Sequence, residues 1–125
     1  MQFNNNGQAI YVQIVDYICE KILLGEYKAE DKIPSVRELA IQLEVNPNTV
    51  ARAYELLKQQ QLVFDKRGIG YFITPEAKSI ALNYRKQEFA EKELPALFRI
   101  MYMLGLEPVD LSAAYETFKN KYTAA

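Results

Sequence analysis

Hydrophobic and polar positions alternate with a helical period at both ends of the chain and with a strand-like pattern between them. Apolar residues that recur every three or four positions are typical of one buried face of an amphipathic helix. On this basis we predict three helices before residue 60, over 10–24, from Ser35 and from Pro47. Their predicted buried residues are Tyr11, Ile14, Val15, Ile18 and Ile22, then Val36, Leu39, Ala40 and Leu43, then Val50, Ala53, Tyr54 and Leu57.

The residues in front of the second and third helices are typical of helix starts. Ser35 is followed three positions later by Glu38, which is the spacing of a capping box. Pro47 suits the first turn of the third helix, where its missing N–H costs no hydrogen bond. Either Asn46 or Asn48 can cap that helix with its side-chain oxygen. The short turn between the two helices is therefore predicted at residues 44–46.

Two β-rich runs, 62–64 and 71–73, follow the third helix and are joined by a polar segment that contains Gly68 and Gly70. Glycine tolerates the positive φ angles of tight turns, so this segment predicts a β-hairpin. Two helices joined by a turn, with a hairpin after them, are the elements of a winged helix-turn-helix that recognises DNA. The predicted fold is mainly α with a small β-hairpin wing.

Beyond Pro75 the pattern is helical again, and about fifty residues with apolar stripes are too few to enclose a core of their own. We predict a winged domain over 1–75 and a helical region over 76–125 that dimerises with a second copy. Pro95 either kinks one long helix or starts a new one. Gly105 is expected to end a helix, and Asp110 to cap the last one. The stripes are Ala77, Ile80, Ala81 and Tyr84, then Leu94, Leu97, Phe98, Met101 and Leu104, then Leu111, Ala114, Tyr115, Phe118 and Tyr122.

Candidate DNA contacts lie at the start of the third helix and at the hairpin tip. The third helix carries a polar group on the side opposite its buried stripe, and Asn and Arg make bidentate contacts with adenine and guanine. The hairpin tip is basic, and its side chains can reach phosphates or a minor groove. The alternative for both groups is capping, turn formation and ordinary solvation. These residues are Asn48, Thr49 and Arg52 in the helix and Lys66, Arg67 and Gly68 in the wing.

The overall charge does not point to nucleic acid. The chain has a net charge of −1, and residues 1–75 carry 8 Lys and Arg against 9 Asp and Glu. Contacts with DNA must then come from local cations and helix N-termini instead of a basic surface. For Arg37, pairing with Glu38 or Glu44 remains an alternative to a phosphate contact. The basic residues on elements expected to face a duplex are Arg37, Arg52, Lys58, Lys66 and Arg67.

Several function classes lack the residues they need. The chain has no histidine and a single cysteine, Cys19, so we expect no metal, no cofactor, no enzymatic activity and no intrachain disulfide. No apolar run approaches the roughly 20 residues that span a bilayer, and the polar start is unlike a signal peptide, which favours a cytoplasmic protein. Tyrosines on the apolar stripes are interpreted as packing residues and not as a stacking surface for single strands. These are Tyr11, Tyr54, Tyr84 and Tyr115.

Four sequence motifs together resemble the GntR family of bacterial transcription regulators, and the short helical tail resembles its YtrA subfamily. The resemblance implies a homodimeric repressor that binds a palindromic operator, with the tail as a dimerisation region that also accepts a small effector. Ala51 stands where many members outside this subfamily have arginine, so no base preference is carried over. The motifs are I-Y-V-Q-I at 10–14, P-S-V-R-E-L-A at 34–40, V-N-P-N-T-V-A-R-A-Y at 45–54 and R-G-I-G-Y-F-I at 67–73.

The resemblance also implies particular DNA contacts. It places them at the start of the second helix, around the start of the third and at the wing. The alternative function is a winged-helix module that associates with another protein and does not recognise DNA. Leu56 projects nearer the polar face of its helix, and the pattern gives no account of it. The implied contacts are Ser35, Arg37, Asn46, Asn48, Thr49, Arg52, Arg67 and Gly68.

Overall fold

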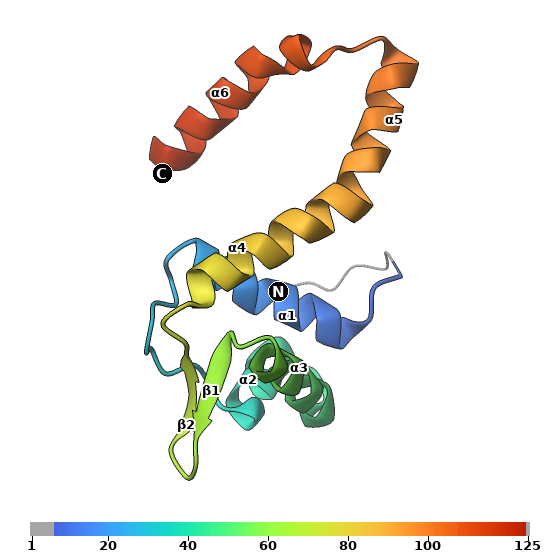
Figure 1. The fold of residues 1–125 in the computed structure, drawn as a ribbon. Coiled ribbons are helices and arrows are strands. Elements are labelled where there is room, and N and C mark those ends of the chain that lie inside the picture. Colours follow the sequence, from blue (N-terminus) through green and yellow to red (C-terminus); the bar gives the residue numbers. More distant parts are fainter. Residues whose placement is uncertain (1–6, 125) are drawn as a thin grey trace. The chain divides into compact units, whose positions relative to one another are not determined.

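The computed structural model describes residues 7–124, which form two compact units, one ending at Lys86 and one beginning at Gln87. In the first unit, three helices pack around a common core, with α1 lying against α3 (Figure 1). The predicted stripes of these helices are buried, apart from Tyr11 and Val36, which are half-buried against the same core. The helices are α1 (Ile10–Leu23), α2 (Val36–Leu43) and α3 (Pro47–Gln59).

The helix-turn-helix is fixed by caps at both helix starts. The Ser35 hydroxyl accepts a hydrogen bond from the backbone N–H of Glu38 at 3.1 Å, and the Glu38 carboxylate accepts one from the Ser35 N–H at 2.9 Å. The predicted capping box is therefore present. Asn46, and not Asn48, caps α3, because its side-chain oxygen accepts from the Asn48 N–H at 2.8 Å. Pro47 occupies the first turn as predicted.

The wing is a two-stranded antiparallel hairpin of β1 (Val63–Lys66) and β2 (Gly70–Ile73), with Val63 opposite Ile73 and Lys66 opposite Gly70. The strands reach further toward the tip than the apolar runs predicted, because the ladder continues through polar residues. Gly70 has a φ of +143°, and a Cβ there would lie 2.9 Å from a side-chain carbon of Lys32. The segment around Lys32 pairs with β2, and the end of the lysine side chain could move away, so it is the positive φ that favours glycine at position 70.

The first unit includes the start of α4 (Ala77–Glu88), which lies alongside α1 in Figure 1. Ala77 and Ala81 are buried in the same core as the first three helices. The Arg85 guanidinium also forms a salt bridge with the Asp16 carboxylate of α1 at 3.3 Å. Core packing and this ion pair thus tie α4 to the winged fold as far as Lys86.

The helix containing Pro95 is continuous with α4. A π-helical turn, η1 (Phe89–Glu93), leads from α4 directly into α5 (Leu94–Leu104). Proline lacks an N–H and clashes with the preceding turn of an α-helix, and a wider π turn in front of it accommodates both effects. Pro95 therefore lies in the first turn of α5 without interrupting the helical path.

The last helix, α6 (Pro108–Ala124), follows a break at Gly105, which has a φ of +70° and ends α5 as predicted. The prediction that Asp110 is the N-cap of this helix is wrong, because the helix already begins at Pro108. Asp110 lies in the first turn, and its carboxylate reaches back to accept from the Glu107 N–H at 2.8 Å. It still satisfies a free N–H at the start of the helix.

Most apolar side chains of the second unit are exposed within the single chain. Among the described residues from Gln87 onward, Met101 alone is buried. Phe98 is 54% exposed and Tyr115 is 61% exposed, so Tyr115 does not pack within the chain. The predicted fold class is confirmed: the molecule is mainly helical with one β-hairpin wing.

Candidate nucleic-acid interface

The first two turns of α3 present an exposed polar face. Val50, Ala53 and Tyr54 are completely buried on the opposite side, and they fix the rotation of the helix about its axis. The Tyr54 hydroxyl donates a hydrogen bond to the backbone oxygen of Pro34 at 2.6 Å, which ties α3 to the start of α2. The outward positions near the start of α3 belong to Asn48 and Arg52, which are exposed, and to Thr49, which is half-buried.

Arg52 is available for an external partner. Its guanidinium carbon lies 4.0 Å from the centroid of the Tyr11 ring, and it forms no salt bridge within residues 7–124. A hollow of about 370 Å³ adjoins it, lined by Ile10 and Tyr11 from α1 and by Asn48, Thr49 and Arg52 from α3. The structure therefore brings the three polar residues predicted on α3 to one concave place on the surface.

The start of α2 presents two further predicted residues. The Ser35 hydroxyl oxygen accepts the capping hydrogen bond from the Glu38 N–H. Arg37 is exposed in the first turn and, in the described part of the chain, pairs with neither Glu38 nor Glu44. Hydrogen bonds from Ser35 lower the pKa of the Glu38 carboxyl, so Glu38 serves the cap as an anion. The alternative in which Arg37 pairs with Glu38 or Glu44 therefore has no salt bridge to support it among the described residues.

The wing carries its basic residues at and beside the tip. Lys66, Arg67 and Gly68 are all exposed. The Lys66 ammonium lies 4.6 Å from the centroid of the Phe72 ring, so its chain crosses the aromatic face of the hairpin. Arg67 lies beyond the last ladder pair, and Gly68 has a φ of +78°, which allows the tight turn.

Lys58 has a different position from the other predicted basic residues. Its ammonium forms a 3.1 Å salt bridge with the Asp65 carboxylate of β1. This hydrogen bond raises the pKa of Lys58 and lowers the pKa of Asp65. Lys58 therefore links the end of α3 to the wing.

Two features of this surface could not be located by periodicity. Tyr11 belongs to the apolar stripe of α1, and only the folded chain shows that its ring also contacts Arg52. Leu56 is half-buried and packs against the core. Both residues lie at the margin of an apolar face, where the helical pattern does not distinguish packing from exposure.

No metal-binding cluster of three or more His, Cys, Asp or Glu side chains occurs among the described residues. Cys19 is buried in the core. In the same part of the chain, no helix is long and apolar enough to cross a bilayer.

A helix-turn-helix with an exposed polar second helix and a basic two-stranded wing defines a winged helix-turn-helix protein. Residues 10–73 match the model of the family described as bacterial regulatory proteins, gntR family. The chain belongs to the GntR family of transcription regulators and, within it, to the YtrA subfamily. It is a regulator of transcription and not an enzyme.

Similar proteins match along most of the chain. The HTH-type transcriptional regulator YhcF of Bacillus subtilis is 35% identical over 113 residues, which cover 90% of this chain and 92% of that protein. The HTH-type transcriptional repressor YtrA of the same organism is 37% identical over 98 residues, covering 78% and 75%. A crystal structure of a GntR-family regulator from Bacteroides thetaiotaomicron is 43% identical, with a TM-score of 0.70 and coverage of 91% and 99%.

Proposed function

We propose that the protein is a sequence-specific repressor that binds a palindromic operator as a homodimer. The observation that carries this proposal is the exposed face at the start of α3, where Asn48, Thr49 and Arg52 border one hollow. Residues at this point of a recognition helix enter the major groove, and Asn and Arg recognise adenine and guanine. The similar YtrA protein of Bacillus subtilis is a transcriptional repressor, which supports the direction of control.

The remaining predicted residues have positioning roles in this proposal. Ser35 and Asn46 stand at the N-termini of α2 and α3, where free N–H groups and the helix dipole favour phosphate. Arg37 adds a positive charge beside the first of these. Lys66 and Arg67 reach the duplex from the wing, and Gly68 allows its backbone to come close. Because bacterial DNA lies in the cytoplasm, we place the activity there.

The homodimer part of the proposal is supported by the second unit. Exposed aromatic side chains such as Phe98 and Phe118 are costly to leave in water. A two-fold dimer would cover the same face on both chains and set the two α3 helices about 34 to 36 Å apart, one duplex turn. Two equal half-sites at that spacing make a palindrome.

The test of DNA recognition is a titration of fluorescent duplexes from the upstream region of the gene, read by anisotropy. Arg52→Ala should weaken operator binding by about 1–3 kcal/mol per half-site and relax the preference at one base pair in each half-site. Arg37→Ala should weaken binding to all sequences alike. Lys58→Ala is the matched control, because it removes a cation from the same helix that is already paired with Asp65.

The salt dependence separates this function from a protein-association module. With few cations in the interface, the logarithm of the affinity should fall with the logarithm of the salt concentration with a slope of about −0.9 per phosphate neutralised. Arg37→Ala removes one phosphate contact from each half-site, and should therefore reduce the magnitude of that slope by about two for the homodimer. If the affinity for the duplexes changed neither with the salt concentration nor with Arg52→Ala, the result would instead favour a module that associates with another protein.

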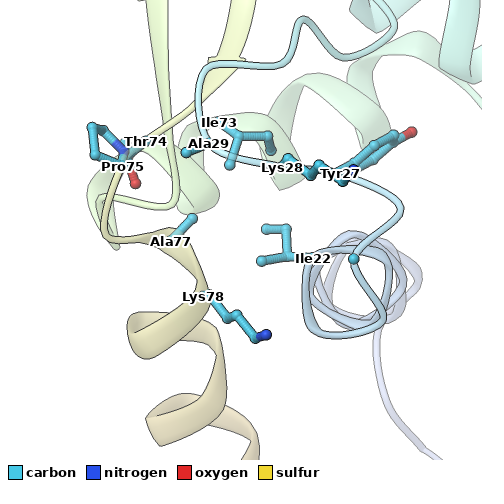
Figure 2. Close-up of a pocket in the computed structure, with 10 residues that line it drawn as sticks. Ile22, Tyr27, Lys28, Ala29, Ile73, Thr74, Pro75, Ala77 and Lys78 are labelled. Atoms are coloured by element: carbon cyan, nitrogen blue, oxygen red, sulfur yellow. The ribbon is translucent and has the colours of Figure 1, made fainter.

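The effector part of the proposal is supported by a cavity of about 370 Å³ in the first unit (Figure 2). Its lining includes the apolar side chains of Ile22, Ile73 and Ala77, together with two lysines, Lys28 and Lys78. Neither lysine forms a salt bridge within the described residues. An apolar lining with two ammonium groups suits a small organic anion. Since β2 and α4 both contribute, a ligand there would act on the base of the wing.

The cavity is tested with benzoate and hexanoate as probes in a titration followed by amide NMR. Saturable shifts at Ala29, Thr74 and Lys78 that disappear in Lys78→Gln are expected. Lys86→Gln is the control, since it removes an exposed cation of α4 that does not line the cavity. Shifts that do not saturate, or that survive Lys78→Gln, would exclude this site for such anions.

A further inference from the structure

The contact between Tyr11 and Arg52 joins two helices at the recognition surface. Tyr11 lies in the first turn of α1, and Arg52 lies in the second turn of α3. At 4.0 Å, this is the shortest contact between a cation and an aromatic ring in the described part of the chain. The ring is half-buried against the core, whereas the guanidinium is exposed. A ring that packs against the core therefore lies next to an exposed guanidinium.

Such a neighbour matters for an arginine that contacts a base. A free arginine samples many rotamers, and that freedom is lost when the side chain binds. A guanidinium placed over an aromatic face is attracted by the ring, and its N–H groups still point outward in its own plane. Those in-plane donors are the ones that bind O6 and N7 of guanine together. The tyrosine can thus hold the arginine without occupying its donors.

The surrounding surface leaves room for a base pair edge. The hollow next to the contact has an apolar wall, formed by Ile10 and Tyr11 of α1, and a polar wall, formed by Asn48, Thr49 and Arg52 of α3. Because α1 supplies one side, the recognition surface is not confined to the helix-turn-helix. The position of the arginine depends on a helix that lies outside that motif.

We propose that Tyr11 is a positioning residue for Arg52 and thereby determines how strongly the protein prefers one base pair in each operator half-site. This inference rests on the proposed function, in which Arg52 contacts a base. Tyr11 pre-orients the guanidinium in the free protein, so that binding to the correct base pair costs less ordering. Its effect falls on discrimination at that base pair and not on general affinity for DNA.

Binding to Arg52→Ala first identifies the base pair at which this variant has lost its preference. Four operator duplexes that differ only at that base pair are then titrated with Tyr11→Leu, Tyr11→Phe and Arg52→Ala, each in the full chain. Tyr11→Leu keeps an apolar side chain but removes the ring, and should reduce discrimination about two- to fivefold. Tyr11→Phe keeps the ring and should retain the parent discrimination. Affinity for unrelated duplex should be unchanged in both.

The double variant Tyr11→Leu with Arg52→Ala should discriminate between the four duplexes as well as Arg52→Ala alone, since the tyrosine acts through the arginine. Thermal melting of each variant controls for the packing of Tyr11 against the core. If Arg52→Ala leaves every preference intact, the proposed base contact is wrong. If Arg52→Ala removes a preference that Tyr11→Leu preserves, or if Tyr11→Leu increases it, the positioning role is overturned.

Discussion

The two compact units of this chain use similar helical patterns with opposite results. In the unit that ends at Lys86, apolar stripes converge from four helices and the base of a hairpin, and side chains such as Leu57 and Ile73 are buried. In the unit that begins at Gln87, stripes of the same period leave Phe98 and Phe118 exposed. An apolar stripe therefore shows which face of a helix is favourable to bury, but not whether the residues that bury it belong to the same chain.

The largest difference is expected for truncation of a leucine in each unit. Leu57→Ala removes a completely buried side chain between α3 and the rest of the core, and should lower the free energy of unfolding by about 2–5 kcal/mol. Leu104 is 67% exposed, so Leu104→Ala should change the stability of the winged unit by less than about 0.5 kcal/mol. Urea unfolding followed by circular dichroism measures both.

A charge placed on the exposed stripe tests what covers the second unit. Phe118 is 60% exposed in the single chain, and burying a glutamate in its place at a dimer interface should cost about 3 kcal/mol or more per chain. Phe118→Glu should therefore shift sedimentation from dimer to monomer and weaken binding to the palindrome, while a half-site duplex binds as before.

Asn120→Glu is the matched control for that variant. It adds the same charge to α6 two residues away, on roughly the opposite side of the helix. It should leave the sedimentation and the operator affinity unchanged. Equal behaviour of the two variants would show that the Phe118 face is not buried in a dimer.

The buried faces and the starts of the helices differ in how far they could be predicted from the sequence. The buried faces of α1 to α3 and the capping box at Ser35 were predictable, because the residues that decide them are close in sequence or complete their packing within one unit. The choice of Asn46 over Asn48 as cap was not, since both have the same chemistry and only the backbone at the helix start separates them. The start of α6 at Pro108, ahead of Asp110, was also not predicted, because it too depends on the backbone at the helix start.

The candidate residues could be proposed from the sequence, but their contacts within the fold could not. Asn48, Thr49 and Arg52 followed from the polar face of one helix. The pairing of Lys58 with Asp65, and of Arg52 with Tyr11, depends on how separate elements pack, which periodicity along one element does not contain. Whether the nine predicted residues contact DNA remains a prediction.

Removal of a helix cap in each unit should have a smaller effect. Ser35→Ala removes the oxygen that accepts from the Glu38 N–H at the start of α2, and should lower the stability of the winged unit by about 1 kcal/mol. Asp110→Ala removes the corresponding acceptor for the Glu107 N–H in α6. Because α6 has few contacts within the chain, this change should speed hydrogen exchange in its first turns and leave the exchange of α3 unaltered.

The last comparison concerns one tyrosine in each unit. Burial raises the pKa of Tyr54 well above its ordinary value, and its hydroxyl donates to the Pro34 oxygen. A raised pKa in the folded state means that the neutral side chain contributes its full stability below the ordinary tyrosine pKa of about 10, and that this contribution falls as the pH rises beyond it. Tyr54→Phe should cost about 1 kcal/mol at pH 7 and make the loss of stability between about pH 10 and 11 shallower.

Tyr102 in α5 is 88% exposed, and its hydroxyl meets water in the folded and the unfolded chain alike. Tyr102→Phe should therefore leave the stability at pH 7 as in the parent. The alkaline profile of Tyr54→Phe is measured by repeating the urea unfolding at each pH. A profile as steep in Tyr54→Phe as in the parent would mean that lysine deprotonation, and not the buried phenol, governs the alkaline unfolding of the winged unit. Burial of Tyr54 in the core would then not be the cause of the loss of stability of the winged unit at high pH.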